Sequence, residues 1–127
     1  GGLKMKANEL YKITKSLMFE KSSSKDYDNY YLANLNNLLV ENFQLNNDIL
    51  ESRGLPVLEN IPFIASGEDE VKYVDILCYD VLPKGLAAKF FIDDDLNKKS
   101  DFYTSYLNAK IEASILVPTT VKDVFEV

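Results

Sequence analysis

A helical spacing of apolar residues between Ser66 and Asp95 constrains the fold of this chain more than any other feature. Ser66 and Asp69 have the spacing of a capping pair, and acidic residues follow where the positive end of a helix favours them. We therefore predict a central helix that begins near Ser66 and ends near Asp95. The apolar residues that recur every three or four positions, as on the buried face of a helix, are Val71, Val74, Leu77, Cys78, Val81, Leu82, Leu86 and Phe90.

Pro83 interrupts this helical pattern. It has no backbone N–H and its ring clashes with the preceding turn near Tyr79, so we predict a kink at this point. The small residues Gly85, Ala87 and Ala88 follow, and they let a second helix approach closely. The sequence thus predicts a bent central helix in which Pro83 and Gly85 form a candidate hinge.

Three other segments, 5–19, 26–53 and 96–113, also have helical periodicity. The second ends before Gly54, which has the position of a left-handed helix cap. Its many asparagines compete for backbone hydrogen bonds, so we expect a break near Gln44. The predicted fold is mainly α, a small bundle of four to five helices.

Residues 55–65, LPVLENIPFIA, connect the second helix to the central one. Their two prolines exclude a helix, and the segment is too apolar for a free linker. We predict an extended connection that lies across the helices, and a short strand over 62–65 is an alternative. The side chains that we expect it to bury are Val57, Ile61, Phe63 and Ile64.

The character of the chain changes at Pro118, which stops the last helix. Residues 118–127 have β-branched and roughly alternating apolar residues, typical of extended structure. The sequence therefore predicts a helical domain over 1–117 and an extended or β C-terminal arm over 118–127. An apolar arm either adds a strand to its own domain or docks on a neighbour. The predicted interface residues are Val121, Val124, Phe125 and Val127.

The composition argues against catalysis and metal binding. The chain has no histidine, and its one cysteine, Cys78, lies on the apolar face of the central helix. Asp93, Asp94 and Asp95 have oxygen ligands that suit Mg²⁺ or Ca²⁺, but an acidic run at a helix end is more often a solvated turn. No apolar run is long enough to span a membrane. We therefore expect a protein that is not an enzyme, with no cofactor and no metal.

Charge is distributed unevenly within the net charge of −6. Residues 1–25 have six lysines and two acids, whereas residues 26–95 have fourteen acids and four basic residues. A basic arm beside an acidic body is consistent with a nucleic-acid tail or with two complementary faces of a self-associating protein. Tyr27, Tyr30 and Tyr31 allow base stacking, but their helical spacing favours core and rim packing.

The order of these elements resembles the head–tail connector, or adaptor, proteins of tailed bacteriophages. The resemblance covers residues 5–113 and leaves out the arm after Pro118. The segments that carry it are LNNDILESRGLP at 45–56, EDEVKY at 68–73, LPKGLAAKFFIDDD at 82–95 and DFYTSYLNAKIEA at 101–113.

This resemblance implies a structural virion protein that forms a ring of about a dozen copies. The ring would join the portal to the tail or stopper proteins in the neck of the virion and line the DNA channel, after assembly in the host cytoplasm. An acidic body suits a channel wall, because like charge keeps DNA from binding to it. The alternative is a soluble, non-viral helical adaptor or regulator that binds another protein.

Overall fold

The computed structural model describes residues 5–19, 25–91, 96–115 and 117. The predicted mainly helical fold is confirmed, and within these residues the sole β pairing is an isolated antiparallel bridge between Lys6 and Glu70. The elements are α1 (Ala7–Leu17), α2 (Tyr31–Ser52), a π-helical turn η1 (Leu77–Val81), α3 (Leu82–Phe90) and α4 (Leu96–Ile115).

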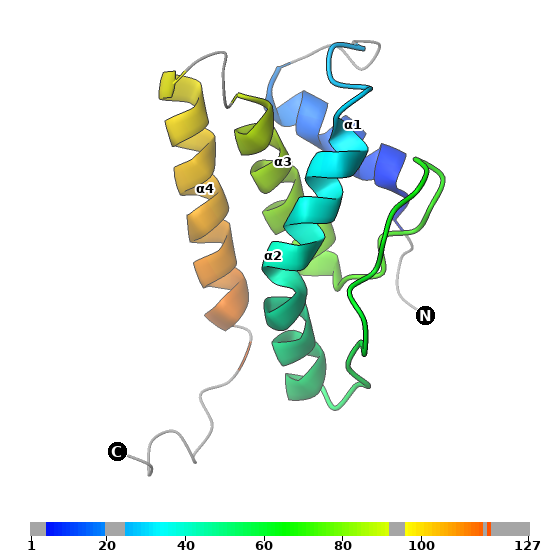
Figure 1. Cartoon of the computed structure of the whole chain (residues 1–127). Coiled ribbons are helices and arrows are strands. Elements are labelled where there is room, and N and C mark those ends of the chain that lie inside the picture. Colours follow the sequence, from blue (N-terminus) through cyan, green and yellow to red (C-terminus); the bar gives the residue numbers. More distant parts are fainter. Residues whose placement is uncertain (1–4, 20–24, 92–95, 116, 118–127) are drawn as a thin grey trace.

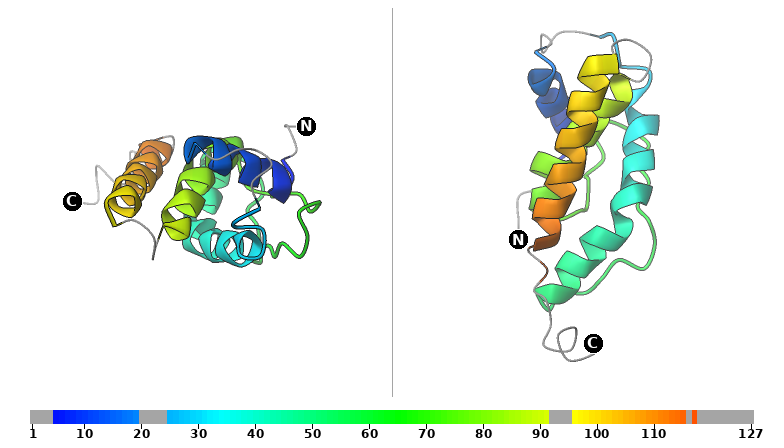
Figure 2. Two further views of the ribbon diagram at one scale, coloured as in Figure 1. Left: turned by 90° about the horizontal axis from the view of Figure 1, so that it is seen from above. Right: turned by 90° about the vertical axis from the view of Figure 1, so that its left-hand side faces the viewer.

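The short helix α3 is the element that the others share, because it packs against α1, α2 and α4. Figure 1 shows α2, α3 and α4 running side by side, with α1 packed crosswise against α3. Seen from above in Figure 2, α4 forms one side of the molecule and the segment after α2 forms the opposite side. The largest fully buried side chains of the core include Leu10, Leu35, Leu38, Leu39, Ile49, Leu77, Leu82 and Leu86.

The predicted start of the central helix at Ser66 is wrong. Residues 66–74 are not helical, and helical structure begins at Asp75. The carboxylate of Asp69 accepts hydrogen bonds from the backbone N–H groups of Ala65 (2.8 Å) and Ser66 (3.0 Å). These bonds close a turn, so the Ser66–Asp69 pair organises a loop instead of a helix cap.

This loop provides the hydrogen-bond acceptors for the start of α1. The backbone N–H of Ala7 donates to the carbonyl oxygen of Asp69, and that of Asn8 donates to the carbonyl oxygen of Gly67, both at 2.9 Å. The first N–H groups of a helix have no partner within it. The loop satisfies two of them and so holds α1 against the rest of the bundle.

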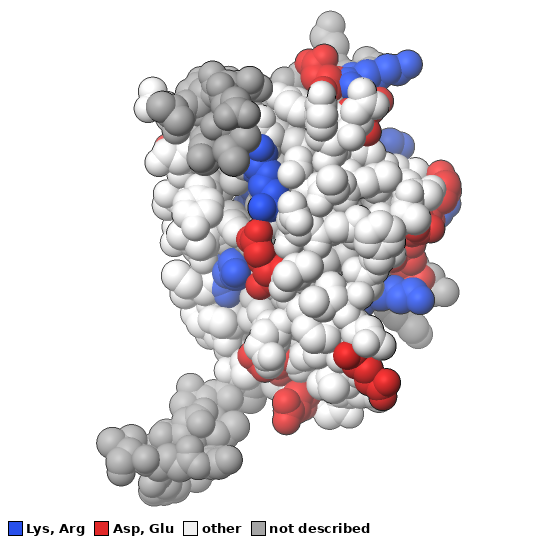
Figure 3. Space-filling view, in the orientation of Figure 1, with Lys and Arg blue, Asp and Glu red and all other residues white. Residues whose placement is uncertain are grey.

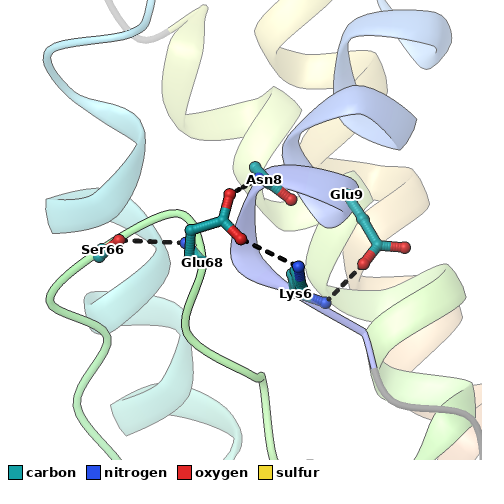
Figure 4. Close-up of polar contacts among 5 residues, drawn as sticks. All are labelled: Lys6, Asn8, Glu9, Ser66 and Glu68. Atoms are coloured by element: carbon teal, nitrogen blue, oxygen red, sulfur yellow. Dashed lines mark hydrogen bonds and ion pairs between the residues drawn. The ribbon is translucent and has the colours of Figure 1, made fainter.

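Side chains add a second set of contacts at the same place, as Figure 4 shows. The carboxylate of Glu68 accepts from Nζ of Lys6 at 2.9 Å and from Nδ2 of Asn8 at 3.1 Å. The Lys6–Glu68 pair is exposed and contributes little stability. It does show that part of the basic charge at the N-terminus is paired with the acidic body of the same chain.

A π-helical turn, Leu77–Val81, ends two residues before Pro83. The backbone N–H of Leu82 donates to the carbonyl of Leu77, one residue further back than in an α-helix. Pro83 lies in the first turn of α3, where the missing N–H of a proline is tolerated. The helix is therefore irregular near Pro83, where the sequence predicts an interruption. The kink itself stays a prediction.

Helix α2 is continuous from Tyr31 to Ser52, so the break expected near Gln44 is wrong. Gly54 has a φ of 71°, and the N–H of Leu55 donates to the carbonyl of Leu50 at 2.9 Å. These features confirm the left-handed cap. Several asparagines of α2 use their amides on other parts of the structure, as described below, so they do not compete with the helix.

Candidate interaction surfaces

Two asparagines of α2 hold the backbone of residues 55–65, which we call the strap. The Oδ1 atom of Asn36 accepts from the N–H of Ile64 (2.8 Å), and its Nδ2 donates to the carbonyl of Ile64 (3.0 Å). Asn47 makes the same pair of bonds with Leu58, at 2.9 and 3.0 Å. Asn36 and Asn47 lie about three turns apart, so both face the same side of α2. The strap is therefore fixed along α2 at two points.

The strap exposes most of the apolar side chains that the sequence analysis expected to be buried. Val57 is 46% exposed, Ile61 43% and Phe63 75%, whereas Ile64 is 2% exposed. The two asparagines clamp residues at even positions, Leu58 and Ile64, against α2. In an extended chain alternate residues point to opposite faces, and Val57, Ile61 and Phe63 at odd positions face outward. A bend at 59–60 interrupts the alternation, and Pro56 and Asn60 are exposed as well. Residues 55–65 contain no helix and no strand, and the expected burial is wrong for all but Ile64.

A second apolar surface lies on α4, and we call it the α4 ridge: Tyr103, Leu107, Ile111 and Ile115. These residues are 51%, 40%, 60% and 73% exposed, and their spacing of four places them along one side of the helix. The opposite side of α4 is in the core, where Tyr106, Ala109 and Ala113 are buried. Figure 3 shows a mostly uncharged surface on the α4 side of the molecule.

A shallow hollow of about 310 Å³ lies at the end of the bundle where α1 and α3 end and α4 begins. The rings of Phe91 and Phe102 stack in it with centroids 5.5 Å apart, and Phe19 on its rim is 97% exposed. Asp101 and Ser105 are the polar residues among those that line it.

A polar network joins α2, α3 and α4 on the side of α4 opposite the α4 ridge. The hydroxyl of Tyr106 accepts from Nδ2 of Asn42 (2.9 Å) and donates to Oε1 of Glu41 (2.8 Å). Lys89 of α3 donates to Oε2 of Glu41 at 2.9 Å. Burial opposes the charge on Glu41, but the hydrogen bonds from Lys89 and Tyr106 outweigh it and lower the pKa of this carboxyl group.

Cys78 is a buried structural residue. It is 3% exposed, and burial raises the pKa of its thiol to about 12. The described residues contain no group of three or more side chains suited to a metal ion. Asp93, Asp94 and Asp95 lie outside the described residues, so the interpretation of this acidic run as a turn stays a prediction.

The candidate residues from the sequence fall into two groups. Val121, Val124, Phe125 and Val127 lie outside the described residues, and their role at an interface stays a prediction. Pro83 and Gly85 are both buried in α3. Gly85 is packed closely against Leu38 and Tyr106, and the role of Pro83 and Gly85 as a hinge stays a prediction.

Of the three tyrosines near the start of α2, two pack against other rings and one is exposed. Tyr31 stacks on Tyr11 with ring centroids 4.2 Å apart, and Tyr27 stacks on Phe90 at 4.3 Å. Tyr30 is 61% exposed. Two of the three rings therefore pack within the protein. The predicted helical spacing of the three is wrong, because residues 26–30 form a turn and α2 begins at Tyr31.

Sequence reasoning missed both exposed surfaces. The signal for the strap was the pair Asn36 and Asn47, whose spacing places both on one face of a helix. The sequence analysis considered only the poor helix propensity of asparagine. The signal for the ridge was a large apolar residue at every fourth position from Tyr103 to Ile115. A row of this kind beside an already complete core face points outward.

Comparisons of the chain with protein-family models, with curated proteins and with solved structures find no match. Among the residues that the structure describes, no helix has the length and hydropathy required to cross a bilayer.

Proposed function

We propose that this chain is a structural subunit that assembles with other proteins, and that its place is the head–tail connector of a tailed bacteriophage. The observation that carries the proposal is the exposure of two apolar surfaces, the strap and the α4 ridge, on opposite sides of one small domain. Large exposed apolar patches mark interaction sites in folded proteins. A ring subunit needs two such surfaces, one for each neighbour.

The resemblance in element order supplies the finer part of the proposal. In this role about a dozen copies form a ring between the portal and the tail or stopper proteins, in the neck of the virion. The acidic body lines the channel, where like charge keeps the duplex sliding. The arm 118–127 docks on the portal or on a neighbouring subunit by strand addition. The protein has a mechanical role and no catalytic one.

The test is to mix the purified chain with its cognate portal protein and to image the product by electron microscopy. The expected image is a second ring stacked on the portal, with about a dozen copies of this chain. A control mixture contains the chain with the arm 118–127 removed. A discrete complex with one unrelated partner, or no binding to the portal, would overturn the proposal in favour of a non-viral adaptor.

A further inference from the structure

Helix α4 has apolar side chains on two opposite sides, and one of these sides lies outside the core. Tyr106, Ala109 and Ala113 are buried, whereas the α4 ridge faces outward. A helix that is apolar on opposite sides is typically covered on both. The ridge belongs to a wider uncharged face, which Lys110 borders on one side and Glu112 on the other. The exposed residues of this face are Ser100, Tyr103, Thr104, Leu107, Asn108, Ile111, Ser114 and Ile115.

The C-terminal arm, residues 118–127, starts where the ridge ends. Ile115 is the last residue of α4 and of the ridge. The N–H of Val117 donates to the carbonyl of Ser114 at 3.0 Å, and Val117 packs against the core. The chain is therefore still in contact with the bundle one residue before the arm. This connection gives the arm a high effective concentration at the ridge, which no separate molecule has.

The arm also has the length to cover the ridge. The ridge rises about 18 Å from end to end. An extended segment from Val121 to Val127, which contains the predicted interface residues of the arm, spans about 20 Å. The residues before Val121 leave room for the chain to reverse. If the arm then runs antiparallel to α4 with Val121 beside Ile115, Phe125 lies level with Leu107.

The charges of the arm complement those that border the ridge. Lys110 and Glu112 lie on opposite borders, and Lys110 makes no salt bridge within the part of the chain that the structure describes. Lys122 and Asp123 are adjacent, so they point to opposite sides of an extended chain. In the antiparallel register both lie level with the turn of α4 that contains Lys110 and Glu112. Asp123 can therefore pair with Lys110 while Lys122 pairs with Glu112.

We infer that in the free subunit the arm 118–127 folds back along α4 and covers the α4 ridge of the same chain. The arm loses conformational freedom when it docks, and this loss offsets most of the gain from burying its apolar side chains. The contact therefore opens readily and changes the melting midpoint little. A release step follows from the proposed function and rests on it: the portal takes the arm, and the ridge is then uncovered for assembly.

Thiol reactivity in the full chain tests the contact. Ile111→Cys reports on the ridge, and Tyr30→Cys is its matched control because Tyr30 is 61% and Ile111 60% exposed. Cys78 gives little background because it is buried. Adding Phe125→Asp, which puts a charge into the apolar contact, is expected to raise the rate at which a small maleimide labels position 111 by at least about threefold. The rate at position 30 should stay unchanged.

A double variant tests the register of the arm on α4. Leu107→Cys combined with Phe125→Cys is expected to form a disulfide within one chain in dilute solution, because the two positions lie level. Tyr30→Cys combined with Phe125→Cys is the control and should stay reduced. A disulfide between two chains would overturn the inference in favour of a contact between copies. Unchanged labelling at position 111 without any disulfide would show that the arm does not cover the ridge.

These measurements use the chain alone, so they are independent of the test with the portal. A protected ridge in a chain that does not bind the portal refutes the proposed function alone. Portal binding by a chain whose ridge is unprotected refutes the inference alone.

Discussion

A methyl group on Gly85 would lie 2.9 Å from Cε1 of Tyr106. It would also lie 2.7 Å from Cδ2 of Leu38. Carbon atoms in packed interiors are separated by about 3.5–4.0 Å, so both contacts are too short. Gly85 is therefore the point at which α3 meets α2 and α4 with no room for a side chain, and the small residues after Pro83 have the packing role that the sequence indicated.

Gly85→Ala is expected to lower the free energy of unfolding by about 1–3 kcal/mol through overpacking. In an open helix the same change would raise stability by up to about 1 kcal/mol, because alanine is the better helix former. The sign of the effect therefore decides between close packing and open space. Urea denaturation measures it, and a Gly85→Ala variant more stable than the parent would contradict the contact with Tyr106.

The strap should loosen when its clamps are removed. Asn36→Ala or Asn47→Ala deletes two hydrogen bonds to the strap backbone, so each is expected to lower the free energy of unfolding by about 1–3 kcal/mol. Local opening of the strap should increase more than global unfolding does, because the strap has few buried side chains to hold it. Proteolysis after Glu59 by an endoproteinase specific for glutamate, under native conditions, measures this opening.

Asn37→Ala is the control for these variants, since Asn37 neighbours Asn36 on α2 but is exposed. It should leave the rate of cleavage after Glu59 unchanged. Equal cleavage rates in Asn36→Ala, Asn47→Ala and Asn37→Ala would show that the asparagines do not hold the strap.

Stability should depend on pH through Glu41. Its pKa is lowered in the folded chain from the ordinary value of 4.5, so the folded state favours the ionised form. The resulting stabilisation is complete above that value and is lost as the pH falls through the lowered pKa. Glu41→Gln removes this contribution, and unfolding measured between about pH 5 and about pH 3 should vary less with pH than in the parent.

Lys89→Met provides a second variant for the same question, because Lys89 donates the 2.9 Å hydrogen bond that favours the charged carboxylate. It should also flatten the pH dependence in the acid range. If both variants kept the full pH dependence of the parent, the stabilising group would lie elsewhere in the chain.

Periodicity was sufficient to predict that α1, α2 and α4 exist, because each buries one regular face, but it placed the start of α2 at residue 26 instead of Tyr31. It failed at residues 66–74, where apolar residues also recur at helical spacing. There the carboxylate of Asp69 binds the N–H groups of Ala65 and Ser66, and the loop carbonyls bind α1. Contacts between segments far apart in the sequence determine the conformation of such a region. The local spacing of apolar residues does not reveal these contacts.

The strap shows a second limit of sequence reasoning. Its apolar residues occupy both faces of an extended chain, and composition alone does not show which face is buried. The choice is made by Asn36 and Asn47, which clamp even positions. A shift by one residue exchanges the two faces of an extended segment, so predicting the buried set required knowing where α2 holds the backbone.

Removal of residues 118–127 should separate folding from docking. The described core lies within residues 5–117, α4 ends at Ile115, and Val117 packs against the core. We therefore expect the truncated chain to keep its helical circular dichroism and its melting midpoint but to lose binding to the portal. The point variant Phe125→Asp should lose binding in the same way, because a charge in an apolar contact carries a large desolvation cost. Lys122→Ala is the control and should bind normally. Loss of helical signal on truncation would mean that the arm belongs to the core, and docking would then have to depend on another part of the surface.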